Sequence, residues 1–365
     1  MVRKFFARFY SVTILNVKGK TIMSHLTRAH QELFTREPDE CFDNLNDLVV
    51  HCEQQRSESQ ELWWPVDSLR AEGLNPHELL LTGSDDRQLR LNDWSFSQLC
   101  GLCGVHKGTV NRLRSDTASQ VFHETLPRSG KPLQLLATGD HVRAIHGVSY
   151  TRLYNAELLD AVLTAAPGFE PPPRAFNGAT GLYCGEQDLF AFLIDPNGWI
   201  DIHGEQFAPG LFCWNSEVGR RSLGVQTFWY QRICGNHIVW DVTDVNEFTR
   251  KHTANVRESL EVIRSMVHEL AKKRDERRSG FVSVVERAMG TRLATTSDAT
   301  INEITRHGFT RSLAEQAVTS AEQTSGGLTI FAIVDALTRL TQKAAYAGDR
   351  AALDQKAGAL LSLAV

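Results

Sequence analysis

The chain of 365 residues is longer than a single core usually supports, so its length predicts two domains or one domain with a large appendage. Hydrophobic residues make up 42% of it and charged residues 22%, a composition that indicates a folded protein and excludes a largely disordered one. The formal net charge of -4 gives no global attraction to nucleic acid or anionic lipid, so any such binding must use a local basic patch. No run of about eighteen apolar residues occurs, and we expect no membrane span.

Motifs that would fix a compartment or a cofactor are scarce. Seven cysteines at irregular spacing form no disulfide framework, which indicates a reducing, cytoplasmic compartment. The sequence has no Gly-rich phosphate loop, no HExxH helix and no GxSxG elbow, and we expect neither a cofactor nor a bound metal. Residues 1–22 are basic and aromatic without an acidic residue. They are either a targeting leader or an extension upstream of a natural start at Met23, and we favour the second interpretation.

The first half of the chain predicts short helices to about residue 60 and then paired strands. Residues 78–93 and 133–144 each predict a hairpin, because turn-forming residues interrupt two apolar runs. Asn155 is the expected N-cap of a helix, and the proline-rich residues 167–174 predict an extended surface loop. Residues 189–204 predict a third hairpin with Pro-Asn-Gly at its turn.

Between the first two hairpins, residues 96–114 have the apolar spacing of a helix-turn-helix unit. If this unit reads duplex DNA, Lys107 and Arg112 lie on or beside the recognition helix. The alternative is an ordinary packed helix pair, which we favour because the unit lies inside a larger domain. Cys100 and Cys103 form a CxxC with no second copy, and we interpret them as packing residues rather than half of a zinc site.

The stretch 210–240 holds the densest group of aromatic, basic and polar residues, and residues 223–229 alternate with the period of a strand. This mixture fits single-stranded nucleic acid, since arginines bind phosphates, aromatic rings stack on bases and amides bond base edges. The candidate binding residues here are Asn215, Arg220, Arg221, Trp229, Arg232 and Asn236, with Trp214, Phe228 and Tyr230 as further stacking platforms.

Two other interpretations of this stretch stay open. A metal-dependent nuclease or other hydrolase would use Cys234 as nucleophile or metal ligand, His237 or His252 as base or second ligand, and Glu217 as acid. In the other interpretation the polar residues form a buried hydrogen-bond network that joins strand ends, and the protein is a non-catalytic scaffold; the network residues would be Asn215, Ser216, Arg232 and Asn236.

After residue 245 the pattern is helical. Residues 247–278 contain no proline or glycine and predict one long helix. Its apolar residues alternate in four- and three-residue steps, as in a coiled-coil seam, which would allow a homo-oligomer; they are Val256, Leu260, Ile263, Val267 and Leu270. Shorter helices complete the chain.

Five segments together resemble the phage and plasmid protein family called domain of unknown function 932. They are HVRAIHGVSYTRLYN, GLYCGEQDLFAFLID, GLFCWNSEVGRRSL, YQRICGNHIVW and DRAALDQKAGALL, and the resemblance runs from about Trp64 to the end. It implies a phage, plasmid or other mobile-element setting. The family brings no established activity and no catalytic residues.

The sequence therefore predicts an α+β protein whose central, largely antiparallel sheet is flanked by helices and followed by a helical C-terminal region. The expected parts are an N-terminal helical extension at 1–60, a central domain at 61–245 and a helical region at 246–365. We expect a nucleic-acid-associated accessory protein of a mobile element that binds single strands.

Overall fold

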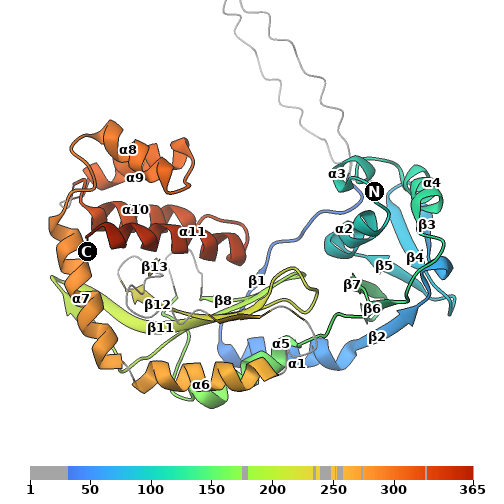
Figure 1. Ribbon diagram of the computed structural model, residues 1–365, viewed down its shortest axis with the longest axis horizontal. Coiled ribbons are helices and arrows are strands. Elements are labelled where there is room, and N and C mark those ends of the chain that lie inside the picture. The colour runs from blue at the N-terminus through green and yellow to red at the C-terminus, as the bar shows by residue number, and fades with distance from the viewer. Residues whose placement is uncertain are drawn as a thin grey trace, which may run out of the picture. The chain divides into compact units, whose positions relative to one another are not determined.

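Two largely antiparallel sheets and the helices packed on them organise the chain, as the computed structural model shows (Figure 1). The structure describes residues 32–174, 180–232, 236–238, 248–250, 252, 258–272, 274–324 and 327–364. Residues from Glu32 onward belong to one unit. The predicted α+β class with a helical C-terminal region is confirmed.

The first sheet has the strand order β2-β6-β7-β5-β4-β3. Its strands are β2 (Ser59–Trp64), β3 (Arg70–Asn75), β4 (Glu78–Thr82), β5 (Gln88–Leu91), β6 (Leu133–Thr138) and β7 (His141–His146). Both hairpins predicted here are confirmed, because β4 pairs with β5 and β6 pairs with β7. Gly139 turns the second hairpin at φ +58, a backbone conformation that favours glycine.

Helices pack on this sheet around the fully buried Phe96, Leu99 and Phe122. They are α2 (Asp93–Leu102), α3 (Lys107–Val110) and α4 (Ser115–Thr125), with the short η1 (Val66–Ser68) after β2. The helix pair predicted between 96 and 114 thus ends in a helix of 4 residues, about 6 Å long, which is too short to lie along a major groove as a recognition helix.

The second sheet has the order β1-β8-β9-β11-β12-β13, with β10 added to β11 and β14 to β12. Its strands are β1 (Glu40–Cys41), β8 (Leu182–Cys184), β9 (Leu189–Ile194), β10 (Ile200–Ile202), β11 (Glu205–Asn215), β12 (Leu223–Gln231), β13 (Asn236–Ile238) and β14 (Phe248–Arg250). The hairpin predicted at 189–204 is wrong, since both β9 and β10 pair with β11. The turn immediately before β11 contains His203 and Gly204, which both have a positive φ.

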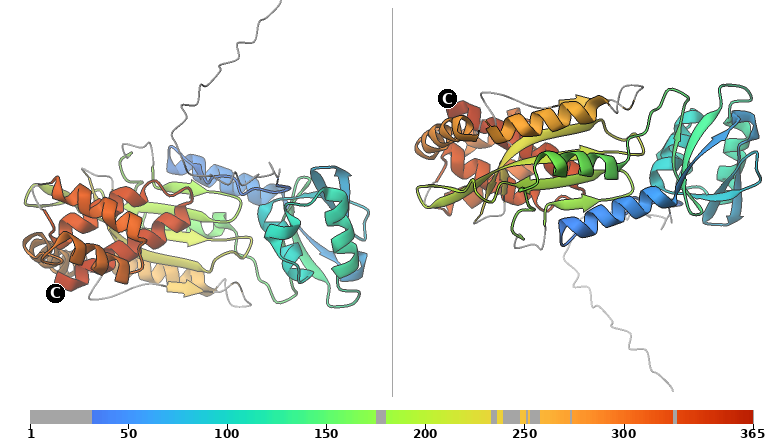
Figure 2. Two further views of the ribbon diagram at one scale, coloured as in Figure 1. Left: turned by 90° about the horizontal axis from the view of Figure 1, so that it is seen from above. Right: turned by 90° about the horizontal axis from the view of Figure 1, so that it is seen from below.

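Helices cover both faces of the second sheet. Leu211, Leu223 and Val225 pack with α1 (Leu45–Glu58), α5 (Asn155–Ala165) and α6 (Glu258–Lys272). Aromatic residues on the opposite face pack against α11 (Ala347–Ala359), which lies beside α10 (Ile330–Thr341). Figure 2 shows the red α10 and α11 in front of the sheet from above, and α1, α5 and α6 in front of it from below. The alternation predicted at 223–229 is therefore correct, but neither face is open to solvent.

The C-terminal region contains α7 (Arg274–Gly290), α8 (Ser297–Arg306), α9 (Arg311–Glu322) and η2 (Leu360–Ala364) besides α10 and α11. The single long helix predicted at 247–278 is wrong: residues 248–250 pair with β12 as a strand, and the helical part is divided between α6, which ends at Lys272, and α7, which begins at Arg274 and runs in another direction (Figure 1). The apolar residues proposed as an oligomer seam instead pack within the chain, because Ile263 and Val267 are fully buried in the core with α5. No helix among the described residues is long and apolar enough to cross a membrane.

Candidate functional site

The turn between β11 and β12, residues 216–222, carries two of the predicted binding residues, Arg220 and Arg221, and directly follows a third, Asn215. The hydroxyl of Ser216 donates to the carbonyl of Gln187 at 2.6 Å and accepts from the backbone N–H of Arg220 at 2.8 Å. Gly219 has φ +73, and a Cβ there would lie 2.6 Å from the ring of His146. The turn is thus held in one conformation that needs glycine.

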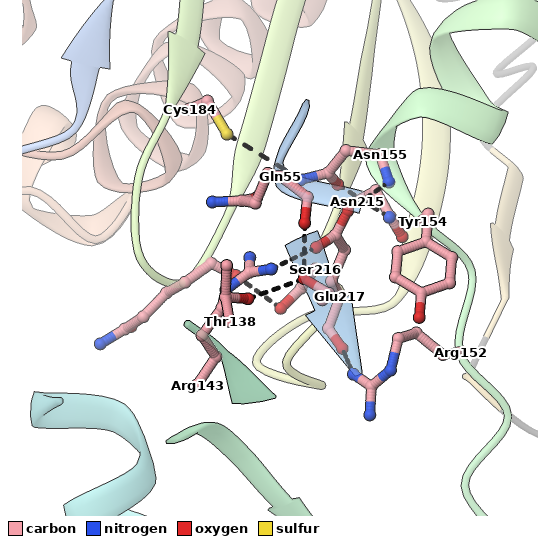
Figure 3. A network of polar contacts seen from close by, with 12 residues as sticks. Gln55, Thr138, Arg143, Arg152, Tyr154, Asn155, Cys184, Asn215, Ser216 and Glu217 are labelled. Carbon is pink, nitrogen blue, oxygen red and sulfur yellow. Dashed lines mark hydrogen bonds and ion pairs between the residues drawn. The ribbon is translucent and has the colours of Figure 1, made fainter. Parts of the chain in front are cut away.

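Glu217 points from this turn into the protein, where only 1% of the residue is exposed. One carboxylate oxygen accepts from Arg143 of β7 at 2.8 Å. The other accepts from the backbone N–H of Asn155 at the start of α5, at 2.7 Å. A carboxylate at a helix N-terminus also interacts favourably with the helix dipole. Glu217 therefore joins the first sheet to the helix on the second sheet (Figure 3).

Neighbouring residues extend this network. Arg152 donates to the carbonyl of Glu217 and pairs with Glu61 of β2 at 3.1 Å. The amide nitrogen of Asn215 donates to the carbonyl of Leu153 and to the side chain of Asn155, both at 2.9 Å. Asn215 is completely buried, so it has the position that the network interpretation expects for it. Figure 3 shows these side chains converging from separate strands and loops.

A stack of three rings lies beside the network. The rings of His146 and Tyr150 are parallel with centroids 3.6 Å apart, and His252 follows on Tyr150 at 5.4 Å. Burial lowers the pKa of His146 to about 3 and that of His252 to about 4, so both imidazoles are neutral at pH 7. Burial raises the pKa of Tyr150, whose hydroxyl donates to the carbonyl of Glu217 at 3.0 Å.

The residues of the hydrolase interpretation are not assembled by the described part of the chain. Cys234 and the side chain of His237 lie outside the described residues. Glu217 is engaged by Arg143 and Asn155. Elsewhere, burial raises the pKa of Cys100 to about 12 and that of Cys103 to about 11, so neither is a thiolate at pH 7. No three His, Cys, Asp or Glu of the described residues are placed to hold a metal ion.

The predicted arginines at the two ends of β12 each lie over an aromatic ring. The guanidinium carbon of Arg220 is 5.6 Å from the ring centroid of Trp94, and that of Arg221 is 5.6 Å from Phe190. At the other end of the strand, Arg232 lies 5.5 Å from Trp199. Arg220 and Arg232 are exposed, and within the described ranges neither forms a salt bridge. Trp94 and Trp199 are half-buried.

The other predicted binding residues have different surroundings. Trp229 is 3% exposed and stacks on Phe281 of α7 with ring centroids 4.1 Å apart, so it belongs to the core. The backbone of Asn236 pairs with β12, while its side chain lies outside the described residues. Lys107 is bound to Asp93 at 2.6 Å. Arg112 is exposed, follows the short α3 and donates to the carbonyl of Gly108 on that helix.

A cavity of about 200 Å³ lies between the aromatic face of the second sheet and α11. Its lining residues are Phe190, Phe212, Trp214, Arg221, Ser222, Gly348, Ala351, Ala352 and Gln355. The guanidinium of Arg221 is held by the buried carboxylate of Asp188 at 3.0 Å. Burial raises the pKa of Asp188, although Arg221 opposes that shift. The cavity thus combines apolar rings with one cation.

Sequence reasoning identified Trp214 and Arg221 but missed Phe190, Phe212 and α11 as the rest of this cavity. Alternate positions of β9 and β11 are aromatic, which was a usable signal for one face of a sheet. The contribution of α11 could not be predicted, because most of its lining residues are glycine and alanine, which carry no functional group.

No protein-family model matches the chain, and neither a curated protein nor a solved structure is significantly similar to it. The resemblance to domain of unknown function 932 therefore stays a prediction that rests on the five segments.

Proposed function

We propose that the protein binds single-stranded nucleic acid as an accessory factor of a phage, plasmid or other mobile element. The observation that carries this proposal is the placement of Arg220, Arg221 and Arg232 over aromatic rings at the two ends of β12. A guanidinium over a ring is held in orientation, and the exposed Arg220 and Arg232 can offer N–H groups to phosphate oxygens, whereas Arg221 is bound to the buried Asp188.

The spacing of these pairs suits an extended chain of phosphates. β12 has 9 residues and is about 30 Å long, so Arg220 and Arg232 are separated by roughly that length. Half-buried rings such as Trp94 and Trp199 offer edges and partial faces to bases. Stacking on an aromatic ring contributes roughly 1–3 kcal/mol per base, so two such platforms with the arginines provide useful affinity without sequence preference.

The test is the salt dependence of binding to a labelled single-stranded DNA or RNA oligonucleotide long enough to span β12. Removing both exposed arginines in R220A/R232A should weaken binding, and the salt slope should become shallower by about 1.4, which is about 0.7 for each phosphate that is no longer bound. Both side chains are at the surface, so the thermal midpoint should not change.

The matched control is R306A/R311A, which removes the same charge from two exposed arginines on the C-terminal helices. It should leave the affinity and the salt slope as in the parent protein. If both double variants weaken binding equally, general charge rather than the β12 arginines causes it and the proposal is wrong.

A further inference from the structure

The cavity beside α11 opens to solvent and is lined by aromatic rings, small residues and polar groups. Phe212 lies with its ring centroid 5.2 Å from that of Trp214, and Phe190 contributes a third aromatic wall. The opposite wall is α11, where Gly348 and Ala351 keep the helix backbone close. A cavity between aromatic rings and a wall of small residues favours a planar occupant.

Glycine maintains this space at two positions. A Cβ on Gly224 of β12 would lie 2.1 Å from the ring of Trp214, and a Cβ on Gly348 would lie 2.3 Å from the guanidinium of Arg221. Trp214 therefore lies directly against the backbone of Gly224, and Arg221 lies against the helix at Gly348. Any side chain at either position would displace a wall of the cavity.

Polar side chains also line the cavity. Gln355 donates to Gln226, so an amide pair from α11 and β12 stands beside the rings, and the hydroxyl of Ser222 adds another donor and acceptor. Amides form hydrogen bonds with the nitrogen and oxygen atoms at the edge of a heterocyclic ring, whereas a hydrocarbon ring has no atoms that could form such bonds. Arg221 adds a cation at the same cavity.

We infer that this cavity binds one nucleobase, with Arg221 near the phosphate that the base carries. The inference deepens the proposed function and rests on it, since it names the part of the nucleic acid that enters the protein. A volume of about 200 Å³ is smaller than the roughly 300–1,000 Å³ of a drug-sized site, so it accommodates one ring system and not a dinucleotide. The base is either that of a free mononucleotide or one base of a strand.

The inference is tested by a substitution that fills the exposed entrance of the cavity. Ala352 lines the cavity and is exposed, so A352F fills the entrance without disturbing the core. Ala359 is also exposed on α11 but does not line the cavity, so A359F is the matched control. Q355L keeps the volume and removes the amide. The thermal midpoints of all three variants are measured first to verify that they fold.

Equilibrium dialysis then uses the four nucleoside 5′-monophosphates, inorganic phosphate, an oligothymidine decamer and an abasic decamer. At least one probe that carries a base should bind, and A352F should lower its affinity at least tenfold while A359F leaves it unchanged. Q355L should reduce the preference among bases. Binding of monophosphates identifies a free nucleotide as a ligand, and binding of the decamer alone identifies a base of a strand. Equal binding by A352F and the parent protein, or equal binding of the abasic and normal decamers with no monophosphate bound, overturns the inference.

The two proposals fail separately. If A352F weakens base binding while R220A/R232A leaves strand binding unchanged, the cavity is supported as a base site and the proposed role of the surface arginines is wrong. If only R220A/R232A weakens strand binding, the strand is bound at the surface and the cavity is not its base site.

Discussion

At the scale of single residues, the polar groups of the central stretch divide by the direction in which they point. Glu217 and Asn215 point inward and are satisfied by partners far along the chain. Arg220, three residues after Glu217, points outward over Trp94. One turn thus carries both a buried and an exposed side chain, so under the proposed function mutations of Glu217 should affect folding and mutations of Arg220 should affect ligand affinity.

Removal of the Glu217 carboxylate should be among the most destabilising changes in the protein. E217A leaves Arg143, itself 7% exposed, as a buried charge without its partner, and such a loss costs about 3–5 kcal/mol in the free energy of unfolding. Chemical denaturation measures this loss. E315A, which breaks an exposed pair with Arg311, should cost no more than about 0.5 kcal/mol. Similar losses in the two variants would show that the Glu217 network contributes little.

At the scale of elements, β12 contributes side chains to the hydrophobic cores on both faces of the second sheet and supports the cavity beside α11. Its side chains alternate between the α6 side and the α11 side, and Trp214 of β11 occupies the space above Gly224. The absence of a side chain at Gly224 is therefore a packing requirement and not a property of a turn.

G224A should destabilise the protein by about 1–3 kcal/mol, because the new methyl group overlaps the Trp214 ring and forces it to move. The near-ultraviolet circular dichroism of the tryptophans should change with it. A Cβ on Gly280 of α7 would meet no atom within 4 Å, so G280A should be neutral or stabilising by up to about 1 kcal/mol. A G224A protein as stable as the parent would show that the strand can shift to make room.

Local elements were predictable where a short stretch determines them. The hairpins formed by β4 with β5 and by β6 with β7 followed from turn residues between apolar runs. The helix α5 was located to within one residue, because Asn155, the expected N-cap, is its first residue and Tyr154 is the N-cap. The partners of Glu217 were not predictable, because Arg143 and Asn155 are more than 60 residues away and nothing local marks them. Polar residues between strands are compatible with either a surface or a buried network, and only the tertiary packing shows that Asn215 and Glu217 are buried.

At the scale of the whole molecule, the network makes the two sheets one thermodynamic unit. Glu61 and Arg143 belong to the first sheet, while Asn155 and Glu217 belong to the elements of the second. Opening either sheet would expose buried charge in the other. We therefore expect the two sheets to unfold together.

This unit should lose stability in mild acid. His146 and His252 are neutral in the folded protein, with pKa values lowered from 6.5 to about 3 and about 4, whereas in the unfolded chain they take up protons near pH 6.5. Their contribution is fully present above pH 6.5 and is lost as pH falls from 6.5 towards 4. The free energy of unfolding should fall by at most about 1.4 kcal/mol per pH unit for each histidine.

Urea denaturation between about pH 7.5 and about pH 5 measures this slope. H252Q should flatten it by as much as one proton, and H203Q, at a histidine whose side chain is 68% exposed, should leave it unchanged. A slope that is the same in H252Q and in the parent protein would contradict the assignment.

The position of Glu217 in the sequence also delays the formation of its ion pair with Arg143 during synthesis. The ribosome makes Glu217 74 residues after Arg143, which takes roughly 4 to 15 s at about 5–20 residues per second. Throughout that interval the first sheet is complete in sequence, yet it carries an arginine whose carboxylate has not been translated. The nascent chain therefore presents this junction to chaperones and proteases in an unfinished, hydrated state until the β11–β12 turn has been translated.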